Sequence, residues 1–457
     1  GGRINTDFID TSAGVGCSDH EVNIKILLGM ATRSGKLTYA QRNKVLADMT
    51  QDVSDLVLMD NYRQSMALTN AEHQSLALAD EHLRFMHALE RTGDLDREVE
   101  FLPSDEDLET RLSAGAGLTR PELSVLLAYA KIALFDDVLE SSLPDDPYLE
   151  NTLGLYFPKL IQKRFPNLVG KHRLRREIIA TYVANTVVNR TGPSFINTIA
   201  ERTGESFATI ARAYLICRQV FGLAELWSGV EALDNSVSAD VQTEMQLGIL
   251  DLISRGTIWF ARNESHGGEI GSIVSAFQPA VARLDKGLDS ILSPALKKTR
   301  DDKASQYISC KAPKALAQRI ANLDALAPAS DIVRIAAGGH FEPEAVAKVF
   351  YGIGDRFGFD WLRASVQQIV RGDEWQKSAT SGIVDDLFAT QTRLVNRIMD
   401  VSGGADIAPA TIEAWAEANG HAVTRATNMI TEIKAGPSVN LAKLSVINRQ
   451  LGALVAG

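Results

Sequence analysis

The sequence predicts a mainly α-helical protein, with sheet confined to a short strand near its amino-terminal end. Three observations support this fold class. Apolar residues recur at spacings of three and four through most of the chain, which is the period of a helix that buries one face. Signatures of helix starts occur at several points along the chain. The 14 prolines occur mostly between the periodic segments, where they end helices.

The amino-terminal end is the one part that predicts a strand. Residues 3–10 partly alternate between polar and apolar types, and the small-residue stretch 11–15 predicts a tight turn. A helix is expected from about Asp19. A strand, a turn and a helix within about 30 residues are typical of the end of an α/β unit. We therefore predict a first segment, 1–37, that forms the edge of an α/β domain.

The pattern of residues 38–457 predicts one large multi-helix domain. Thr38 and Gln41 form a capping-box pair before a long periodic segment. Residues 119–122 (Thr-Arg-Pro-Glu) place a capping threonine, a proline and a glutamate where a helix start favours them. The helix behind them carries one apolar face.

The sequence leaves the organisation of this helical domain open. A glycine pair at 267–268 interrupts the helical pattern. A division into two sub-lobes, 38–265 and 266–457, is therefore the alternative to a single helical assembly.

Composition excludes several classes of partner. The 47 lysines and arginines against 57 aspartates and glutamates give a formal net charge of -10. A protein that neutralises nucleic-acid phosphates or anionic lipid needs the opposite balance, so we expect neither partner. No apolar run approaches the roughly 20 residues of a membrane span. Cys17, Cys217 and Cys310 are too scattered for a disulfide framework or a metal site, which favours a reducing cytoplasm.

One segment, 7–21, combines the predicted strand end, the Ala-Gly turn and the helix start. Ligands in open α/β sheets bind at the carboxyl ends of strands, and free N–H groups at a helix start favour carboxylate or phosphate. The Ser18 hydroxyl could donate to such a carboxylate. The alternative is that Ser18 is an ordinary N-cap, with Glu21 closing a capping box. On the residues alone, the capping role is favoured.

Several segments are similar to known proteins in both content and order. They are residues 1–10, 17–25 (Cys-Ser-Asp-His-Glu-Val-Asn-Ile-Lys), 118–123, 127–131 (Leu-Ala-Tyr-Ala-Lys), 156–158 (Tyr-Phe-Pro), 172–178 and 357–362. Together they resemble the carboxyl-terminal portion of the large bacterial NAD-specific glutamate dehydrogenases. The turn at 11–15, followed by Ser18 and Glu21, resembles the end of that family's nucleotide-binding domain.

The resemblance implies oxidative deamination of L-glutamate to 2-oxoglutarate and ammonia, with NAD as hydride acceptor, in a homo-oligomer. It implies that Ser18 holds the substrate's side-chain carboxylate and that Thr11, Ala13 and Gly14 lie beside the nicotinamide end of NAD. The sequence departs from the family at two positions. The family usually has asparagine at the position of Thr11 and aspartate at the position of Gly16.

The resemblance also implies that the main chemistry lies outside these residues. In the family, the catalytic lysine, the acid–base carboxylate and the glycine fingerprint precede the matching segments. We therefore expect no catalytic residue in the chain, and we predict that it is inactive alone. The eight histidines are dispersed, so we expect no metal site either. Its expected role is that of a scaffold, a regulatory region or an oligomerisation region of the dehydrogenase. A non-enzymatic helical interaction or regulatory protein is the alternative.

Overall fold

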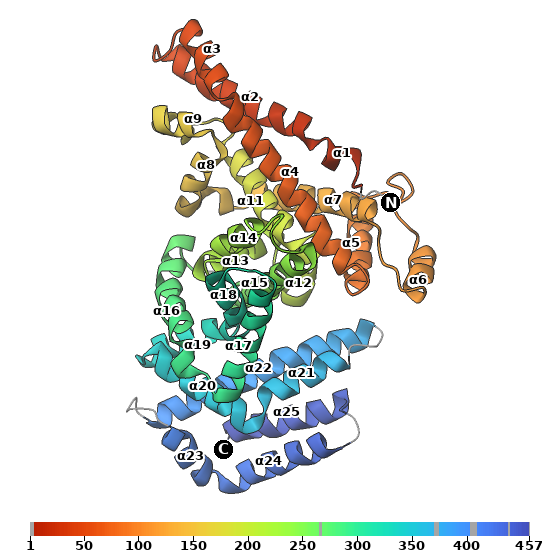
Figure 1. Cartoon of the computed structure of the whole chain (residues 1–457), viewed down its shortest axis with the longest axis vertical. Helices are drawn as coiled ribbons and strands as arrows, with labels where there is room; N and C mark the ends of the chain where they lie inside the picture. The colour runs from red at the N-terminus through yellow and green to blue at the C-terminus, as the bar shows by residue number, and fades with distance from the viewer. Residues whose placement is uncertain (1–3, 265–266, 370–373, 403–408, 437–438, 457) are drawn as a thin grey trace. The chain divides into compact units, whose positions relative to one another are not determined.

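The computed structural model describes residues 4–264, 267–369, 374–402, 409–436 and 439–456 (Figure 1). Over these residues every regular element is a helix and no strand occurs. The prediction of a mainly helical chain is therefore confirmed. The chain forms two compact units, Gly1–Ala224 with Gln242–Ser275, and Glu225–Val241 with Ala276–Gly457. Within the described ranges, no helix is both long enough and apolar enough to span a bilayer.

The first unit contains most of the shorter helices. They are α1 (Asp7–Asp10), α2 (Ser12–Arg33), α3 (Tyr39–Asp48), α4 (Thr50–His73), α5 (Ala79–Thr92), α6 (Asp105–Ser113), α7 (Arg120–Glu140), the 3-10 turns η1 (Leu143–Asp145) and η2 (Pro147–Leu149), α8 (Glu150–Tyr156), α9 (Lys159–Arg164), α10 (Pro166–Val169), α11 (Arg175–Thr191), α12 (Phe195–Thr203) and α13 (Phe207–Val220). Three helices cross the boundaries between the units: α14 (Leu223–Glu231), α15 (Ala239–Glu264) and α16 (Ile270–Ile291).

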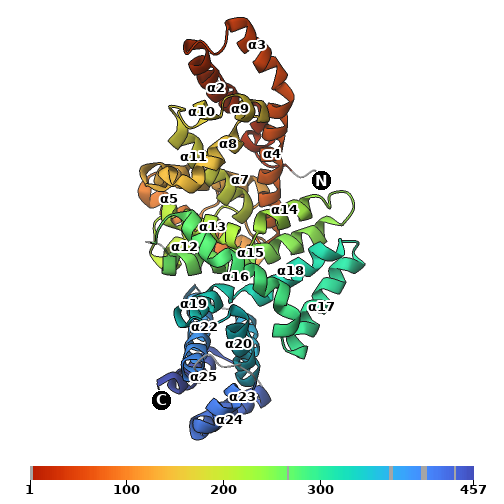
Figure 2. The same cartoon turned by 90° about the vertical axis from the view of Figure 1, so that its left-hand side faces the viewer.

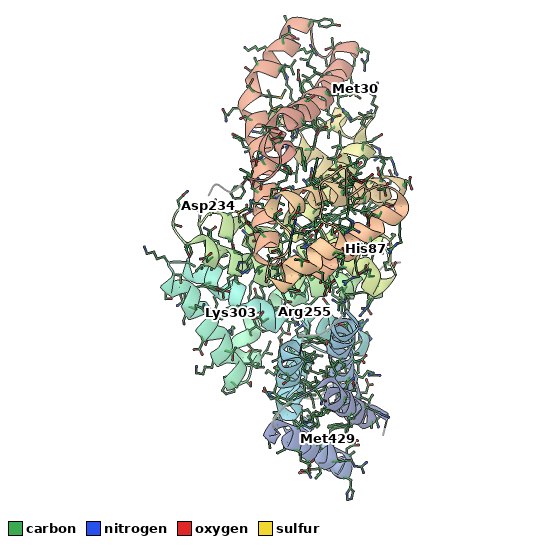
Figure 3. The ribbon with its side chains drawn as sticks, turned by 90° about the vertical axis from the view of Figure 1, so that its right-hand side faces the viewer. Met30, His87, Asp234, Arg255, Lys303 and Met429 are labelled. Carbon is green, nitrogen blue, oxygen red and sulfur yellow. The ribbon has the colours of Figure 1, made fainter. Side chains whose placement is uncertain are left out.

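The second unit is also built of helices packed on helices. They are α17 (Pro294–Ser309), α18 (Lys314–Leu326), α19 (Ala329–Gly339), α20 (Pro343–Phe357), α21 (Phe359–Gln368), α22 (Glu374–Ser402), α23 (Pro409–Ala418), α24 (Gly420–Ala435) and α25 (Leu441–Ala456). Helix α22 packs against α20 and α25, and α24 packs against α25. Met429, labelled in Figure 3, marks α24.

Helix α7 lies at the centre of the first unit. It packs against α11, α4 and α13. Its predicted apolar face is buried as expected, through Leu123, Leu126, Leu127, Ala130, Leu134 and Val138. The predicted start is also confirmed, because the Thr119 N–H donates to Glu122 Oε2 at 2.7 Å.

Helices α2, α3 and α4 form the amino-terminal end of the first unit. In Figure 2, α2 and α4 run side by side and α3 joins their ends, in agreement with their contacts. Met30 lies near the end of α2 (Figure 3). The predicted capping box before α3 is confirmed: the Thr38 N–H donates to Gln41 Oε1 at 2.9 Å, and the Gln41 N–H donates to Thr38 Oγ1 at 3.2 Å.

The predicted strand at 3–10 is wrong over the described residues 4–10. A strand needs a neighbour to accept its backbone hydrogen bonds, and the described part of the chain contains no other strand. The backbone N–H of Asn5 instead donates to Asp10 Oδ2 at 3.1 Å, and the Asn5 side-chain amide donates to Asp10 Oδ1 at 2.6 Å. These bonds fold the segment onto the first turn of α1.

The predicted turn at 11–15 is wrong as well, because α2 begins at Ser12, well before Asp19. A helical glycine costs about 1 kcal/mol relative to alanine. Burial of the apolar face of α2, which includes Ile24, Leu27 and Leu28, outweighs this cost for Gly14 and Gly16.

Gly16 also has a packing role. A Cβ at Gly16 would lie 3.3 Å from Cγ1 of Val57 on α4, closer than an ordinary contact. The absence of a side chain therefore allows α2 to approach α4 closely.

The predicted domain boundaries remain predictions. The compact units divide the chain by packing, and such units need not coincide with the domains of a family. The compact units therefore do not test the predicted division after residue 37 or the predicted sub-lobes 38–265 and 266–457.

Two helical glycines give a matched test of packing in the first unit. A Cβ on Gly256 of α15 would overlap the buried Sγ of Cys217, whereas nothing lies within 4 Å of a Cβ on Gly154 of α8. We expect Gly256→Ala to destabilise the protein by about 1–3 kcal/mol through overpacking. We expect Gly154→Ala to stabilise it by about 0.5–1 kcal/mol. Urea unfolding of both variants checks this, and equal shifts would contradict it.

His82 on α5 predicts a dependence of stability on pH. Its side chain is fully buried, neither ring nitrogen has a hydrogen-bond partner among the described residues, and burial lowers its pKa from 6.5 to about 4. Between these values the unfolded chain binds a proton that the folded chain does not, so folding stability falls as the pH drops from 6.5 towards 4. At about pH 5 the loss is roughly 2 kcal/mol.

His82→Leu removes this effect. We expect the variant to gain stability relative to the native chain on going from about pH 7.5 to about pH 5, in urea unfolding at both values. Both proteins contain the other buried histidines, so the effects of those residues on stability cancel when the variant is compared with the native chain. A stability difference that is the same at both pH values would contradict the assignment.

Candidate functional site

The residues predicted to bind substrate and cofactor lie on the solvent side of α2. Thr11 at the N-cap position, Gly14 and Ser18 follow one another at intervals of three and four, so they share one side of the helix. All three are exposed. Val15 and Val22 flank them and are 76% and 51% exposed. We call these five residues the exposed stripe.

Ala13 is the one predicted site residue that does not join the stripe. It is exposed, but it lies five positions before Ser18, which places its side chain about 140° away around an α-helix.

The predicted capping role of Ser18 is wrong. Ser18 lies inside α2, which begins at Ser12, so there is no free helix end for it to cap. The Glu21 carboxylate accepts from Lys25 one turn further on and does not reach back to Ser18. No side chain in the described part of the chain bonds the Ser18 hydroxyl, which faces solvent.

Thr11 and Gly14 each offer one feature that the nicotinamide end of NAD could use. The Thr11 hydroxyl donates to the Asp7 carbonyl oxygen, so its oxygen can accept a hydrogen bond from a carboxamide but its proton is already used. A Cβ at Gly14 would meet nothing within 4 Å, so the backbone there is open to a flat ring.

A group of polar side chains lies on the other flank of the same helix, between α2, α4, α7 and α8. We call it the α2 polar cluster. Its members are Asp19, His20 and Asn23 of α2, Asp60 of α4, Lys131 of α7, Tyr156 of α8, and His172, which precedes α11.

Tyr156 makes the central contacts of the α2 polar cluster. Its hydroxyl donates to Asp19 Oδ2 at 2.7 Å and accepts from Asn23 Nδ2 at 2.9 Å. Its ring stacks on His20, with centroids 4.5 Å apart and planes at 29°. Burial, together with the hydrogen bond to Asp19, raises the pKa of Tyr156, so the hydroxyl remains a donor at neutral pH.

His172 fixes the same helix from a second direction. Its Nε2 lies 3.1 Å from the Asn23 carbonyl oxygen, and the Leu174 N–H lies 3.2 Å from its Nδ1. A carbonyl oxygen only accepts and an N–H only donates, so the proton is assigned to Nε2. Burial lowers the pKa of His172, which agrees with this neutral form.

Asp60 and Lys131 form the most strongly desolvated part of the cluster. Burial lowers the pKa of Lys131 to about 8, although the charge of Asp60 acts in the opposite direction. Burial likewise raises the pKa of Asp60, against the attraction of Arg63 and Lys131. The pKa of His20 is lowered by burial, despite Asp19 and Asp60.

Sequence reasoning did not identify this cluster, although signals for it were present. Lys131 interrupts the apolar stretch 123–135 of α7, and a charged residue within such a stretch is unusual. Tyr156 and His172 belong to segments that resemble the family. Their convergence on α2 is visible only in three dimensions.

The described residues contain no group of three or more His, Cys, Asp or Glu side chains arranged to hold a metal ion. The α2 polar cluster holds α2 through hydrogen bonds to Tyr156 and His172.

Comparison with known protein families shows to which class of protein the chain belongs. Residues 115–453 match the family described as glutamate dehydrogenase, C-terminal, so the chain is of the glutamate dehydrogenase class. Residues 1–71 match the family described as bacterial NAD-glutamate dehydrogenase, catalytic domain. The chain belongs to the bacterial NAD-specific glutamate dehydrogenase family and matches its carboxyl-terminal portion, as the resemblance implied.

Curated relatives agree over nearly the whole chain. The NAD-specific glutamate dehydrogenases of Halomonas elongata, Pseudomonas aeruginosa and Mycobacterium tuberculosis are 38%, 36% and 31% identical to it. Each match covers 451 residues, which is 99% of this chain and 28% of the relative. The chain therefore spans less than a third of the length of these proteins.

The α2 polar cluster contains residues from both of the ranges that match a family. Asp19, Asn23 and Asp60 lie in the range matched by the catalytic-domain family, whereas Lys131, Tyr156 and His172 lie in the range matched by the C-terminal family. Both ranges contribute to the same compact unit.

The neighbouring charges of Lys131 and Asp60 give a prediction for titration. We expect one lysine to titrate near pH 8 in NMR spectra of the chain carrying ¹³C-methylated lysines, because burial lowers the pKa of Lys131 to about 8. Lys131→Met should remove that signal. Asp60→Asn should lower its pKa further, because the neighbouring negative charge is lost. If no lysine titrates below about pH 9.5, the burial of Lys131 is refuted, and if Asp60→Asn raises the pKa, the influence of the Asp60 charge on Lys131 is refuted.

Proposed function

We propose that these residues are part of an enzyme that oxidises L-glutamate to 2-oxoglutarate and ammonia, with NAD as hydride acceptor. The names of the three relatives and the match of residues 1–71 to the catalytic-domain family support this activity. In this proposal the chain supplies the last part of the catalytic domain and a helical scaffold. It is inactive alone, because the lysine and the acid–base carboxylate of the reaction belong to other parts of the enzyme.

Ser18 binds the side-chain carboxylate of glutamate in this proposal. The observation that carries it is the exposed stripe: a hydroxyl without an internal partner faces solvent on a helix that is anchored from behind. A hydroxyl that already served as a cap would have its hydrogen bonds satisfied within the helix. Ser18 is inside α2, so its hydroxyl is available to a ligand.

Thr11 and Gly14 contribute to the nicotinamide end of the NAD site, and Ala13 lies next to them. NAD supplies the hydride acceptor when it is bound. The accepting oxygen of Thr11 and the open backbone at Gly14 are the features that suit them to this role. Since Thr11 has lost the donor and acceptor pair of an asparagine amide, its contribution to NAD affinity is smaller than that of the usual residue.

The helical body serves as a scaffold for a homo-oligomer in the cytoplasm. Large apolar side chains at the amino-terminal end support an assembly role, since Ile4 and Phe8 are 68% and 47% exposed. Such side chains are usually covered in an assembled protein.

Ser18→Ala in the full-length dehydrogenase tests the substrate role. We expect the KM for glutamate to rise about ten- to a hundred-fold, because a hydrogen bond to a charged group is worth roughly 1.5–3 kcal/mol. The KM for NAD should change much less. The kcat should also change little, because a contact made equally in the ground state and the transition state affects mainly KM.

Cys17→Ala is the matched control, since Cys17 is exposed on the same helix but lies off the exposed stripe. It should leave both constants unchanged. Ser18→Ala should not destabilise the protein, because alanine is favoured inside a helix by roughly 0.5 kcal/mol. An unchanged KM for glutamate in Ser18→Ala would remove Ser18 from the substrate site.

A further inference from the structure

We propose that Tyr156 is a positioning residue for the substrate helix: its hydroxyl, held between Asp19 and Asn23, sets the orientation of the turn of α2 that carries Ser18. The inference rests on the proposed role of Ser18. It gives the helical region a specific part in binding glutamate, beyond that of a passive scaffold.

The first step in the argument is the bridging geometry. Asp19 and Asn23 are four residues apart, so they lie one above the other on the same flank of α2. The Tyr156 hydroxyl contacts both, at 2.7 Å to Asp19 Oδ2 and 2.9 Å to Asn23 Nδ2. One group that holds two successive turns limits both the rotation of the helix about its axis and its sliding along it.

The second step is that the Tyr156 hydroxyl both donates and accepts a hydrogen bond. Asp19 can only accept when ionised, and the Asn23 amide nitrogen can only donate. The tyrosine hydroxyl satisfies both at once. A phenylalanine at this position would remove both of these bonds but keep the ring that stacks on His20. Asn23 Nδ2 would retain only its longer bonds to Asp19 Oδ1 and to the Asp19 carbonyl oxygen, each 3.2 Å. The hydroxyl can therefore be removed while the aromatic packing is kept.

The third step is that Asp19, which Tyr156 holds, lies next to Ser18 in the helix. Asp19 is the next residue after Ser18, about 100° around the helix. A small rotation of this turn moves the Ser18 hydroxyl directly. Hydrogen bonds are strongly directional, and displacements of about 1 Å can change rates by about a hundred-fold.

The remaining contacts of the helix support the same orientation. His172 donates to the Asn23 carbonyl oxygen at 3.1 Å, within the same turn. Gly16 allows the close approach of α2 to Val57 on the preceding turn. The Tyr156 hydroxyl is the contact in this set that joins Asp19, the neighbour of Ser18, to the range matched by the C-terminal family.

Tyr156→Phe in the full-length dehydrogenase tests the inference. We expect the KM for glutamate to rise about five- to tenfold, which is the loss expected when one hydrogen bond keeps a binding group in place. The kcat and the KM for NAD should each change less than about twofold. A variant that merely loosens the fold would lower the melting temperature and the amount of active enzyme without this selective change.

A double-mutant cycle with Ser18→Ala separates positioning from general structure. If Tyr156 acts through Ser18, Tyr156→Phe should change the KM for glutamate less than about twofold in the Ser18→Ala background, although it changes it several-fold in the native background. Equal effects of Tyr156→Phe in both backgrounds would overturn the inference.

Tyr129→Phe is the matched control. The Tyr129 hydroxyl also donates to a carboxylate, Glu100 Oε1 at 2.8 Å, but Tyr129 and Glu100 have no part in the α2 polar cluster. It should leave the KM for glutamate unchanged. An equal rise in KM for Tyr129→Phe and Tyr156→Phe would overturn the specific role of Tyr156.

The outcomes also separate this inference from the proposed function. No change of KM in Ser18→Ala refutes the substrate role of Ser18, and the inference with it. A large change in Ser18→Ala with none in Tyr156→Phe leaves the substrate role intact and refutes the positioning role.

Discussion

The Arg120 side chain, at the first residue of α7, holds the amino-terminal segment on the helical body. It is 10% exposed, and its nitrogens donate to Asn5 Oδ1 at 2.5 Å, to Thr69 Oγ1 at 3.0 Å and to the Ser65 carbonyl oxygen at 2.9 Å. Helices satisfy their backbone groups internally, so the placement of one helix against another depends on side chains such as this one. Asn5 in turn binds Asp10, which sets the position of α1 and the start of α2.

The helical parts of the fold were predictable because their signals are local. A capping box such as Thr38 with Gln41, or the apolar face behind Thr119, lies within a few neighbouring residues. The predicted strand at 3–10 was wrong over the described residues 4–10 for the opposite reason. A strand depends on a partner elsewhere in the chain, and here Asn5 instead accepts a hydrogen bond from Arg120, 115 positions away. The start of α2 was placed too late because its two glycines look like a turn, and only the packing of α2 on α4 makes them helical.

The candidate site was predictable in part for a similar reason. The exposed stripe lies on one helix, so the spacing of Thr11, Gly14 and Ser18 is apparent once the segment is recognised as helical. The α2 polar cluster was not predictable, since Asn23 and Tyr156 are 133 positions apart. No periodicity or cap relates residues so distant in the chain. Lys131 alone gave a local sign of it, as a charge within an apolar helix.

Helix α2 presents the exposed stripe and an anchored flank that share the same few turns. Each residue added to or removed from an α-helix rotates all that follows it by about 100°. One insertion between Ser18 and Asn23 would therefore turn Asn23 away from Tyr156 while Ser18 kept its place. The number of residues in this interval is thus a constraint in addition to the identities of Asp19 and His20, and related proteins should vary here by substitution rather than by change of length.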